Sequence, residues 1–518
     1  MGNTKYDRQR VPESTFADYC ITALDRRGDH IAFLHDQREL TGNESVDLAR
    51  RIATVLRESG LTLGAGIAVL SGNLPEAFLV MVATHIVGGR HTGLAPLGSE
   101  SDHRFVIEDS RAQILVYDPR SFSSRARELA STPGIDRVFS LGPGPVGEDL
   151  LALAELVEPT AGSSAASSDD CASIFYTGGT TGRPKGVVHS HRSALFQALL
   201  VQSNWQWPED IKLLITAPIT HAAGQLVAPA LALGGHVVLM DKFDAGETLR
   251  IVEKHQISVT FLVPTMIYAL LDHPDIDRRD LSSMQTLVYG ASSISRPRLV
   301  EAHERFGSVL MQGYGQTEIG VGCLLLRKED HQLSRPHLLA AAGRPPAGIT
   351  AAILDEKGNK VSVGQPGELC LRGTSVMQQY WNQPELTEQV LVDGWLHTGD
   401  IATCDGEGYY YIVDRKKDMI VSGGFNVYPK EIEDVLHSHP AVEFAAVVGV
   451  PDDKWGESVH ALVKISDGAE IEVDDLRSLV RLMKGPIYTP KEIHFTDDFP
   501  LTALGKLDKK AIKRRLSP

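Results

Sequence analysis

The chain has 518 residues and a mass of 56.4 kDa, so we expect one large domain and at least one smaller one. Hydrophobic residues make up 42% and charged residues 23%, a balance typical of a folded globular protein and not of a disordered or fibrous one. The 51 basic residues against 66 acidic ones give a net charge of −15, which opposes nonspecific binding to nucleic acid or to an anionic membrane. We therefore expect no nucleic-acid partner.

Neither the cysteines nor the first residues indicate export. The five cysteines are scattered without a CxxC pair, which favours neither a disulfide framework nor a thiolate zinc site. The polar start lacks the apolar core of a signal peptide, and Tyr6 stands where a myristoylation motif needs Ser or Thr. The most apolar stretch, 222–240, contains Pro229 and His236, so a buried helix followed by a strand is favoured over a membrane span. We expect a cytoplasmic protein without stable membrane insertion.

Short apolar runs, each followed by a turn and a helical pattern, recur along the first two thirds of the chain. The run at 67–73 precedes a helical pattern at 75–87, and the run at 259–264 precedes another at 265–273. Because they are continuously apolar, these runs predict strands of a parallel sheet covered on both faces. Further strands of this kind are expected at 114–118, 235–241, 286–292 and 308–315.

The pattern changes after Arg344. Short strands joined by Gly and Asp turns are expected at 349–359, 367–373 and 408–424, as an antiparallel or barrel-like section. A smaller α+β unit follows, with helices at 429–436 and 473–482 and strands at 444–450 and 458–465. The Ser- and Ala-rich segment 159–170 predicts a flexible surface loop.

The segment 176–186 reads YTGGTTGRPKG and follows an apolar run. Its glycines let the backbone approach a ligand, its threonine hydroxyls can donate to phosphate oxygens, and Lys185 adds a positive charge. It is not a Walker loop, because no Ser or Thr follows Lys185. A surface turn is the alternative, and the density of such residues makes a phosphate-binding loop the better prediction.

This loop resembles the phosphate-loop signature of the adenylate-forming superfamily, which includes acyl-CoA synthetases, aryl-CoA ligases, luciferases and the adenylation domains of peptide synthetases. Further segments match in the family's order: YGAS at 289–292, QGYGQTE at 312–318, GWLHTGD at 394–400, DRKKDMIVSGGFNVYPKEIE at 414–433 and PLTALGK at 500–506. The resemblance implies an α/β fold with two parallel-type sheet subdomains and a small barrel-like section. It also implies an AMP-binding adenylation domain at 1–414, a hinge at 415–417 and a small mobile α+β domain at 418–518.

The resemblance assigns an ATP and Mg²⁺ site. In chemical terms Tyr314 offers a flat face for a base and Glu318 a carboxylate for a metal, although a core Tyr in a turn would look alike. Asp400 can accept two ribose hydroxyls, with a turn Asp as the alternative. The resemblance assigns Thr177 and Glu318 to the metal, and the following residues to ATP or AMP: Thr177, Gly178, Gly179, Thr180, Thr181, Gly182, Lys185, Gly290, Ala291, Ser292, Gly313, Tyr314, Gly315, Gln316, Thr317, Asp400, Ile412, Arg415 and Lys506.

The resemblance also implies catalysis in two half-reactions. A carboxylate attacks the α-phosphorus of ATP and releases pyrophosphate, after which a thiol attacks the acyl adenylate. Lys506 is the expected adenylation lysine, since an ammonium can stabilise charge as it moves between the two groups; Thr317, Glu318 and His221 are the other predicted catalytic residues. After adenylation the small domain is expected to rotate about Lys417, so that a tunnel for CoA is lined by Ser422, Gly423 and Gly424.

The resemblance implies an acid pocket around the segment 216–225. This segment holds no carboxylate to pair with an α-ammonium, which argues against an amino-acid substrate and for a plain fatty, cyclic or aromatic acid. His221 stands at the family's gate position, and a core His is the alternative. The predicted pocket residues are His221, Ala222, Gly224, Gly290 and Gly313.

These observations predict an ATP- and Mg²⁺-dependent carboxylic acid:CoA ligase. Only twelve residues follow Lys506, so we expect no fused carrier domain and free CoA as the acceptor. A biosynthetic enzyme that passes its adenylate to a carrier-protein thiol or another nucleophile remains the alternative. A noncatalytic acyl or nucleotide binder is disfavoured by the intact motif residues, and a homodimer stays open.

Overall fold

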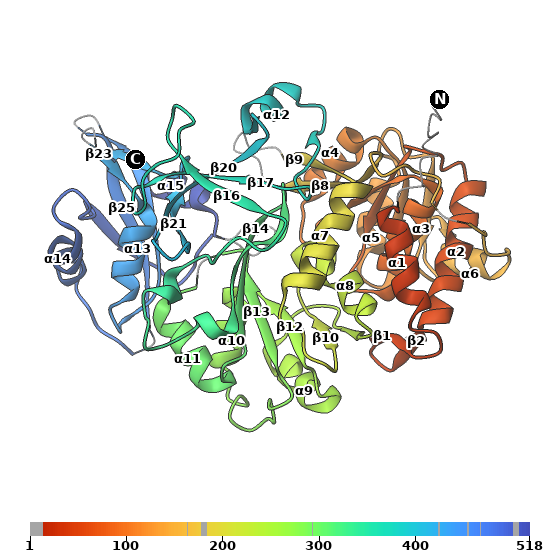
Figure 1. Cartoon of the computed structure of the whole chain (residues 1–518), viewed down its shortest axis with the longest axis horizontal. Helices are drawn as coiled ribbons and strands as arrows, with labels where there is room; N and C mark the ends of the chain where they lie inside the picture. The colour runs from red at the N-terminus through yellow and green to blue at the C-terminus, as the bar shows by residue number, and fades with distance from the viewer. Residues whose placement is uncertain are drawn as a thin grey trace, which may run out of the picture.

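The computed structural model describes residues 14–162, 164–177, 184–292, 294–422, 425–452, 455–466, 468–500 and 507–517. Within these ranges the chain forms four sheets (Figure 1). Two large sheets occupy the N-terminal part, a smaller β section adjoins them, and a fourth sheet belongs to the small C-terminal domain. The predicted α/β class is confirmed, including the barrel-like section and the α+β end of the chain.

The first large sheet carries the predicted phosphate-binding segment on two adjacent strands. Its strands, in spatial order, are β18 (Gln379–Tyr380), β9 (Lys185–Ser190), β8 (Cys171–Thr177), β4 (Arg90–Gly93), β3 (Gly66–Leu70), β5 (Ala112–Tyr117), β6 (Arg137–Ser140) and β7 (Glu148–Asp149). The chain segments between them include α3 (Pro75–Val87), α4 (Glu100–Ser110), α5 (Pro119–Leu129) and α6 (Leu150–Glu155). The β8–β9 and β9–β18 pairs are antiparallel, so this sheet is mixed where a parallel one was expected.

The second large sheet is also mixed. Its order is β15 (Gly320–Leu326), β14 (Leu310–Gln316), β13 (Thr286–Gly290), β12 (Val259–Leu262), β10 (Lys212–Ile215), β11 (His236–Leu239), β1 (Ile31–His35) and β2 (Arg38–Thr41), of which the two edge strands are antiparallel to their neighbours. Its helices are η1 (Ala222–Leu226), α8 (Val227–Ala232), α9 (Ala245–His255), α10 (Pro264–Leu271) and α11 (Arg296–Phe306). The apolar stretch 222–240 thus forms helices followed by a strand, as predicted.

One large apolar core joins the two sheets. It combines side chains of α1 (Phe16–Asp25), α2 (Gly42–Glu58), α3 and α8 with strands of both sheets, and α7 (His191–Asn204) lies beside it. Capping boxes at Thr15 and Thr41 fix the starts of α1 and α2. In the described part of the chain, every helix is too short or too polar to cross a bilayer.

The β section stands over the ends of both large sheets. It consists of β16 (Thr350–Leu354), β17 (Gly367–Arg372), β20 (Trp395–Cys404), β19 (Leu391–Val392) and β21 (Tyr410–Arg415), with α12 (Pro384–Val390) and the short helices η2 (Lys328–Asp330) and η3 (Leu338–Ala340) nearby in sequence. Its core includes Leu369 and Leu396 together with Val187 from β9 and Cys323 from β15. The section therefore holds both large sheets in one arrangement.

The C-terminal domain is a sheet with helices on both faces (Figure 1). Its strands are β23 (Phe425–Val427), β22 (Ile420–Ser422), β25 (Gly456–Ile465), β24 (Val442–Asp452) and β26 (Glu492–Phe495). Alternate residues of β24 and β25 pack on one face against α13 (Pro429–His437) and α14 (Val473–Lys484), and on the other against Ile512 of α15 (Lys509–Leu516).

Candidate active site

A single continuous cleft of about 3710 Å³ lies where the four sheets meet. It is lined at the ends of β8, β13 and β14, by the β section, and by residues of the small domain. In open α/β sheets ligands bind at the carboxyl ends of parallel strands, and β13 and β14 end in this cleft. The cleft is therefore the candidate active site.

Lys185, Glu318 and Tyr380 form a compact polar cluster in this cleft. The Lys185 Nζ donates to Glu318 Oε1 at 2.8 Å and to the Tyr380 hydroxyl at 2.5 Å, and that hydroxyl donates to the same carboxylate oxygen at 2.7 Å. The strands β9, β18 and the turn after β14 bring these residues together. Burial opposes ionisation of Glu318, but the Lys185 ammonium and the hydrogen bonds from Lys185 and Tyr380 hold its pKa below the usual range. Glu318 is therefore an anion inside the protein.

Thr177 lies directly opposite Lys185 in the β8–β9 pair. Its Oγ1 is buried and has no hydrogen-bond partner among the described residues. A buried hydroxyl without a partner is costly unless a ligand contacts it. The hydroxyl thus fits a phosphate or metal contact, and together with Glu318 it offers the oxygen ligands that Mg²⁺ prefers. Gly178, Gly179, Thr180, Thr181 and Gly182, which complete the predicted loop, lie outside the described residues.

A second cluster gathers around Asp400. The hydroxyl of Tyr314 donates to Asp400 Oδ2, the Gln316 side-chain amide donates to the same oxygen at 2.9 Å, and Arg415 Nε lies 3.6 Å from Oδ1. Burial raises the pKa of Asp400, which Arg415 and the two hydrogen bonds oppose. The Oδ1 edge, beside the half-exposed Arg415, suits a ribose hydroxyl. The predicted residues Tyr314, Gln316, Asp400 and Arg415 are thus brought together at one wall of the cleft.

Beside the Asp400 cluster, the backbones of β13 and β14 approach each other very closely and form a wall of the cleft. Gly290 of β13 pairs with Gly313 of β14, and a Cβ on Gly290 would lie 2.3 Å from the Gly313 carbonyl oxygen. A Cβ on Gly315 would lie 2.2 Å from the Gly320 carbonyl oxygen. Ala291, with φ +67°, and Ser292 continue this wall into the cleft. The glycines are required because the strands leave no room for a side chain where a flat base is expected to lie.

His189 positions Thr317 from beneath the cleft. Its Nε2 lies 2.7 Å from the Thr317 carbonyl oxygen, and its Nδ1 lies 3.0 Å from the Gln197 amide nitrogen. Because the Gln197 nitrogen can only donate, Nδ1 accepts and Nε2–H donates to Thr317. Burial lowers the pKa of His189, so the ring is neutral at neutral pH. Sequence patterns did not identify His189 or Tyr380, because Tyr380 reaches the site through the pairing of β18 with β9 and His189 contacts Thr317 from another sheet.

Of the predicted acid-pocket residues, Gly290 and Gly313 belong to the β13–β14 wall, and the others stand around η1, another part of the chain that borders the cleft. His221, at the start of η1, and Ala222 line it, and the Thr220 hydroxyl lies 2.8 Å from His221 Nδ1. Gly224 does not line the cleft: a Cβ there would lie 1.8 Å from the Ile219 carbonyl oxygen, so this glycine permits the turn that presents His221. Phe261, Met266 and Val321 complete a largely apolar wall.

Part of the small C-terminal domain lines the cleft. Leu507, Asp508 and Lys510 line the cleft, so the segment directly after Lys506 borders it, while Lys506 itself lies outside the described residues. Ser422 ends β22 and pairs with Gly456; it does not itself line the cleft, although Ile420 of the same strand does. Gly423 and Gly424 lie outside the described residues.

The predicted hinge residue Lys417 lies in the turn after β21, at the border of the cleft. Two hydrogen bonds span this turn. The Lys430 backbone N–H donates to Asp414 Oδ2 at 2.8 Å, and Lys430 Nζ donates to the carbonyl oxygen of Ile412, another cleft residue, at 3.0 Å. They connect the small domain to the last strand of the β section.

Comparison with known proteins agrees with this architecture. The AMP-binding enzyme family matches residues 21–381, and the AMP-binding enzyme C-terminal domain matches residues 431–506. The chain is similar to the medium/long-chain-fatty-acid–CoA ligase FadD8 of Mycobacterium tuberculosis, with 41% identity over 94% of this chain and 87% of the relative. It is also similar to a feruloyl-CoA synthase of an Amycolatopsis species, with 36% identity over 93% of this chain and 95% of that protein.

A solved structure shows the same arrangement with nucleotide bound. The ATP-bound MatB of Rhodopseudomonas palustris superposes with a TM-score of 0.88 at 29% identity, covering 96% of this chain and 98% of that one. The sequence motifs, the fold and the comparison with known proteins therefore agree. The chain belongs to the AMP-binding enzyme family, as an ATP-binding, AMP-forming enzyme of the acyl-CoA ligase type.

Proposed function

We propose that this protein is a carboxylic acid:CoA ligase that adenylates a fatty or aromatic acid with ATP and Mg²⁺ and transfers the acyl group to the CoA thiol. The observation that carries the proposal is the single cleft that holds the Lys185–Glu318–Tyr380 cluster, the Asp400 cluster and an apolar pocket. The similarity to a medium/long-chain-fatty-acid–CoA ligase and to a feruloyl-CoA synthase supports both the fatty and the aromatic class of acid.

The first half-reaction joins a carboxylate oxygen to the α-phosphorus and breaks the bond between that phosphorus and the pyrophosphate oxygen. Lys185 is proposed to neutralise phosphate charge, and Thr177 and the backbone after β14 to donate hydrogen bonds; all of them border the cleft. Bound Mg²⁺, held by Glu318 and Thr177, would neutralise the charge of the departing pyrophosphate. Lys506 is proposed to bridge the attacking carboxylate and the α-phosphate. Positioning and electrostatics therefore carry this step.

The apolar lining of the pocket supports an apolar acyl group. Its walls include Ala222, Ala223, Phe261, Val263 and Met266. Burial of methylene or ring carbons against these apolar side chains is favourable by about 25 cal/mol per Å² of apolar surface removed from water. His221, at the mouth of this region, is proposed to gate the pocket. We place medium or long fatty acids first, because the 41% identical relative acts on them, and aromatic acids second.

The second half-reaction needs another arrangement of the small domain. We propose that the domain at 418–518 rotates about the 415–417 hinge, removing Lys506 and bringing Ser422, Gly423 and Gly424 to the cleft as a tunnel for the pantetheine arm. The present orientation, with Leu507 in the cleft and Ser422 outside it, is suited to adenylation. The CoA thiol then attacks the acyl carbon, and AMP leaves with the electron pair of the broken acyl–phosphate bond.

The test is pyrophosphate release with ATP and Mg²⁺ over a panel of fatty, cyclic and aryl acids, with and without CoA, with products identified by mass spectrometry. We expect a fatty or aromatic acid to stimulate release and CoA to convert its adenylate to the acyl-CoA. An adenylate that CoA cannot discharge, but that a phosphopantetheinylated carrier or an amine does, would overturn the acceptor assignment. Absence of pyrophosphate release with every acid would overturn adenylation itself.

Lys506→Ala tests the role proposed for Lys506 in the first half-reaction. We expect it to abolish adenylate formation and to leave thioester formation from a supplied acyl adenylate largely intact, because the lysine acts in the first half-reaction only. The two half-reactions are measured separately by pyrophosphate exchange and by acyl-CoA formation. Equal loss of both would contradict the assignment.

A further inference from the structure

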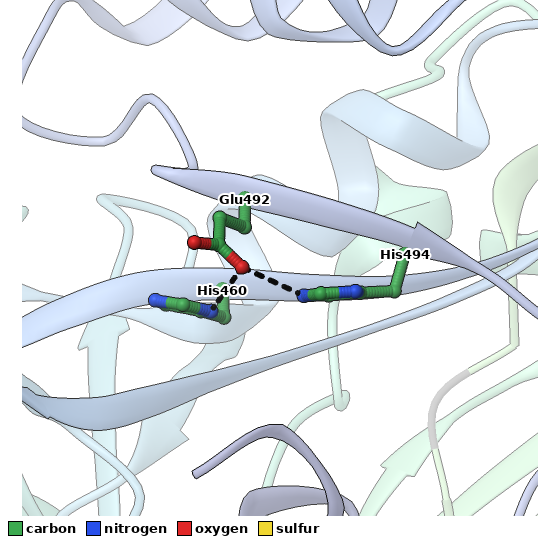
Figure 2. Close-up of side chains that lie close together, drawn as sticks. All are labelled: His460, Glu492 and His494. Atoms are coloured by element: carbon green, nitrogen blue, oxygen red, sulfur yellow. Dashed lines mark ion pairs between the residues drawn. The ribbon is translucent and has the colours of Figure 1, made fainter. Parts of the chain in front are cut away.

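A cluster of two histidines and a glutamate lies in the small domain, outside the lining of the active-site cleft. His460 belongs to β25, and Glu492 and His494 belong to β26. The two strands are parallel, and their register places His460 beside Glu492. Because alternate residues of a strand face the same side, His494 joins Glu492 on that face. Figure 2 shows the three side chains converging from the two strands.

The ligand atoms of the three residues are close to one another. Glu492 Oε2 lies 3.2 Å from His494 Nε2 and 3.9 Å from His460 Nδ1, and the three residues offer ligand atoms that all lie within 4.8 Å (Figure 2). Zn²⁺ bonds to nitrogen and oxygen at about 2.0–2.2 Å, so in a tetrahedral site the ligand atoms are about 3.3 Å apart. Small rotations of the side chains suffice to close the cluster around an ion. The Glu492 side chain is 55% exposed, so an ion can enter from solvent.

The hydrogen bonds around His460 direct a lone pair into the cluster. Its Nε2 lies 3.1 Å from the Ser458 Oγ, and that hydroxyl donates to the Val450 carbonyl oxygen at 3.5 Å. Ser458 therefore accepts from Nε2–H, which leaves His460 Nδ1 unprotonated and facing Glu492.

Among the described residues, no lysine or arginine forms an ion pair with Glu492. In the described part of the chain, His460 Nδ1 and His494 Nε2 are buried atoms without a hydrogen-bond partner. Two acceptors, the His460 nitrogen and the Glu492 carboxylate, face each other, an arrangement that a shared cation would satisfy. The neighbouring Lys491 is engaged with Asp452 at 2.8 Å.

We propose that His460, Glu492 and His494 bind one divalent transition-metal ion, with Zn²⁺ as the favoured ion and water as a fourth ligand. Two imidazoles and a carboxylate suit Zn²⁺ and its neighbours better than Mg²⁺ or Ca²⁺, which prefer oxygen ligands. The ion joins the edge strand β26 to β25. Its role is to stabilise the small domain, and it takes no part in the chemistry of the cleft.

A second group of His and Asp residues differs from this cluster in its charged partners. His35, Asp36 and Asp241 also lie close together, at the ends of β1 and β11. There His35 Nε2 contacts Asp241 directly at 2.8 Å, and Arg120 contacts the same carboxylate oxygen at 2.9 Å. The guanidinium already supplies the positive charge at that place, whereas in the described part of the chain no arginine or lysine pairs with Glu492.

The binding test uses the full chain, treated with chelator and titrated with ZnCl₂ by calorimetry without nucleotide. Other histidines and cysteines of the chain can also bind Zn²⁺. The proposed site is therefore identified as the one that is lost when its own ligands are replaced. We expect His494→Gln and Glu492→Gln to lose one tight site, or to weaken it more than about 100-fold, and Ser458→Ala to weaken it about tenfold. The matched exposed variants His30→Gln and Glu470→Gln should retain it.

A second readout locates the ion and is independent of ligase activity. Zn²⁺ should slow hydrogen exchange of the β26 amides in the wild-type chain and leave exchange unchanged in Glu492→Gln. Circular dichroism of each variant checks that the fold is retained. Equal Zn²⁺ stoichiometry and affinity in the wild type and His494→Gln would overturn the proposal, as would unchanged β26 exchange in the Zn²⁺-treated wild type.

Discussion

At the scale of single residues, the phenol of Tyr380 connects the two charged groups, Lys185 and Glu318, that we propose to act on the phosphates and Mg²⁺. It accepts from Lys185 and donates to Glu318, so it holds both in one place. Tyr380→Phe keeps the ring and removes these contacts with charged groups, each worth about 1.5–3 kcal/mol. We expect adenylation, measured by pyrophosphate exchange, to fall about tenfold or more, and the thermal midpoint to fall as well because these contacts also stabilise the folded chain.

Tyr410→Phe is the matched control for this prediction. Its hydroxyl donates to the Ala351 carbonyl oxygen at 2.9 Å within the β section, and Tyr410 does not line the cleft. Adenylation should therefore be unchanged in this variant. An equal effect of the two substitutions, or none from Tyr380→Phe, would contradict the role assigned to the Tyr380 hydroxyl.

At the scale of elements, the β13–β14 pair forms the wall that we propose to bind the base, because its backbones meet there without side chains between them. In Gly290→Ala, the new Cβ would lie 2.3 Å from the Gly313 carbonyl oxygen and must push the strands apart. Overpacking of this kind costs about 1–3 kcal/mol. We expect a lower thermal midpoint and an ATP dissociation constant raised about tenfold or more, measured by calorimetry.

Gly406→Ala provides the comparison, since a Cβ at Gly406 would meet nothing within 4 Å. Both changes add one methyl group to a glycine, so only the position differs. ATP affinity and thermal midpoint should stay at the wild-type values in Gly406→Ala. ATP affinity that is unchanged in Gly290→Ala would reject this wall as the base-binding surface.

At the scale of the whole molecule, three buried histidines make the large domain sensitive to acid. His85, His91 and His191 pack together, with ring centroids of His85 and His191 5.1 Å apart. Burial lowers the pKa of His91 and His191 to about 4 and that of His85 well below its usual 6.5. The unfolded chain therefore binds more protons than the folded one below pH 6.5, and stability falls as the pH drops from there toward 4.

His191→Phe should flatten this dependence, because the variant keeps an aromatic ring and loses one titrating group. Each such histidine contributes a slope of up to about 1.4 kcal/mol per pH unit. Urea unfolding, followed at about pH 7 and about pH 5, measures the difference. The exposed His30→Gln should leave the slope unchanged. A slope in His191→Phe equal to that of the wild type would show that another group causes the acid sensitivity.

The two domains are connected by contacts that a rotation about Lys417 would have to break. Lys430→Met removes the charged hydrogen bond to the Ile412 carbonyl oxygen, worth about 1.5–3 kcal/mol, and keeps the aliphatic chain. This should disfavour the present orientation. We expect slower pyrophosphate exchange and an unchanged or faster conversion of supplied acyl adenylate to acyl-CoA.

Lys464→Met, which removes a lysine paired with Glu443 within the small domain, is the control for this change. It should affect neither half-reaction, because its ion pair does not span the hinge. If Lys430→Met slows both half-reactions equally, the contact supports the general fold of the domain and not the choice of orientation.

The sequence by itself determined the element types, the order of the motifs and the chemistry of the nucleotide site. Apolar runs such as 259–264 became buried strands, and the segment 222–240 became helices and a strand, because these patterns depend on local periodicity. The residues Lys185, Tyr314, Glu318, Asp400 and Arg415 were identifiable because they stand in short motifs, and they do line one cleft.

Only the tertiary structure decided which distant segments meet. The antiparallel pairing of β9 with β18 brings Tyr380 to Lys185, although 195 positions separate the two residues. His189 supports Thr317 from another sheet, and β25 and β26 place His460 beside Glu492. Strand pairing of this kind depends on how whole faces pack, and local propensity does not encode it. The mixed sheets and the groups that position the catalytic cluster therefore emerged from the folded chain alone.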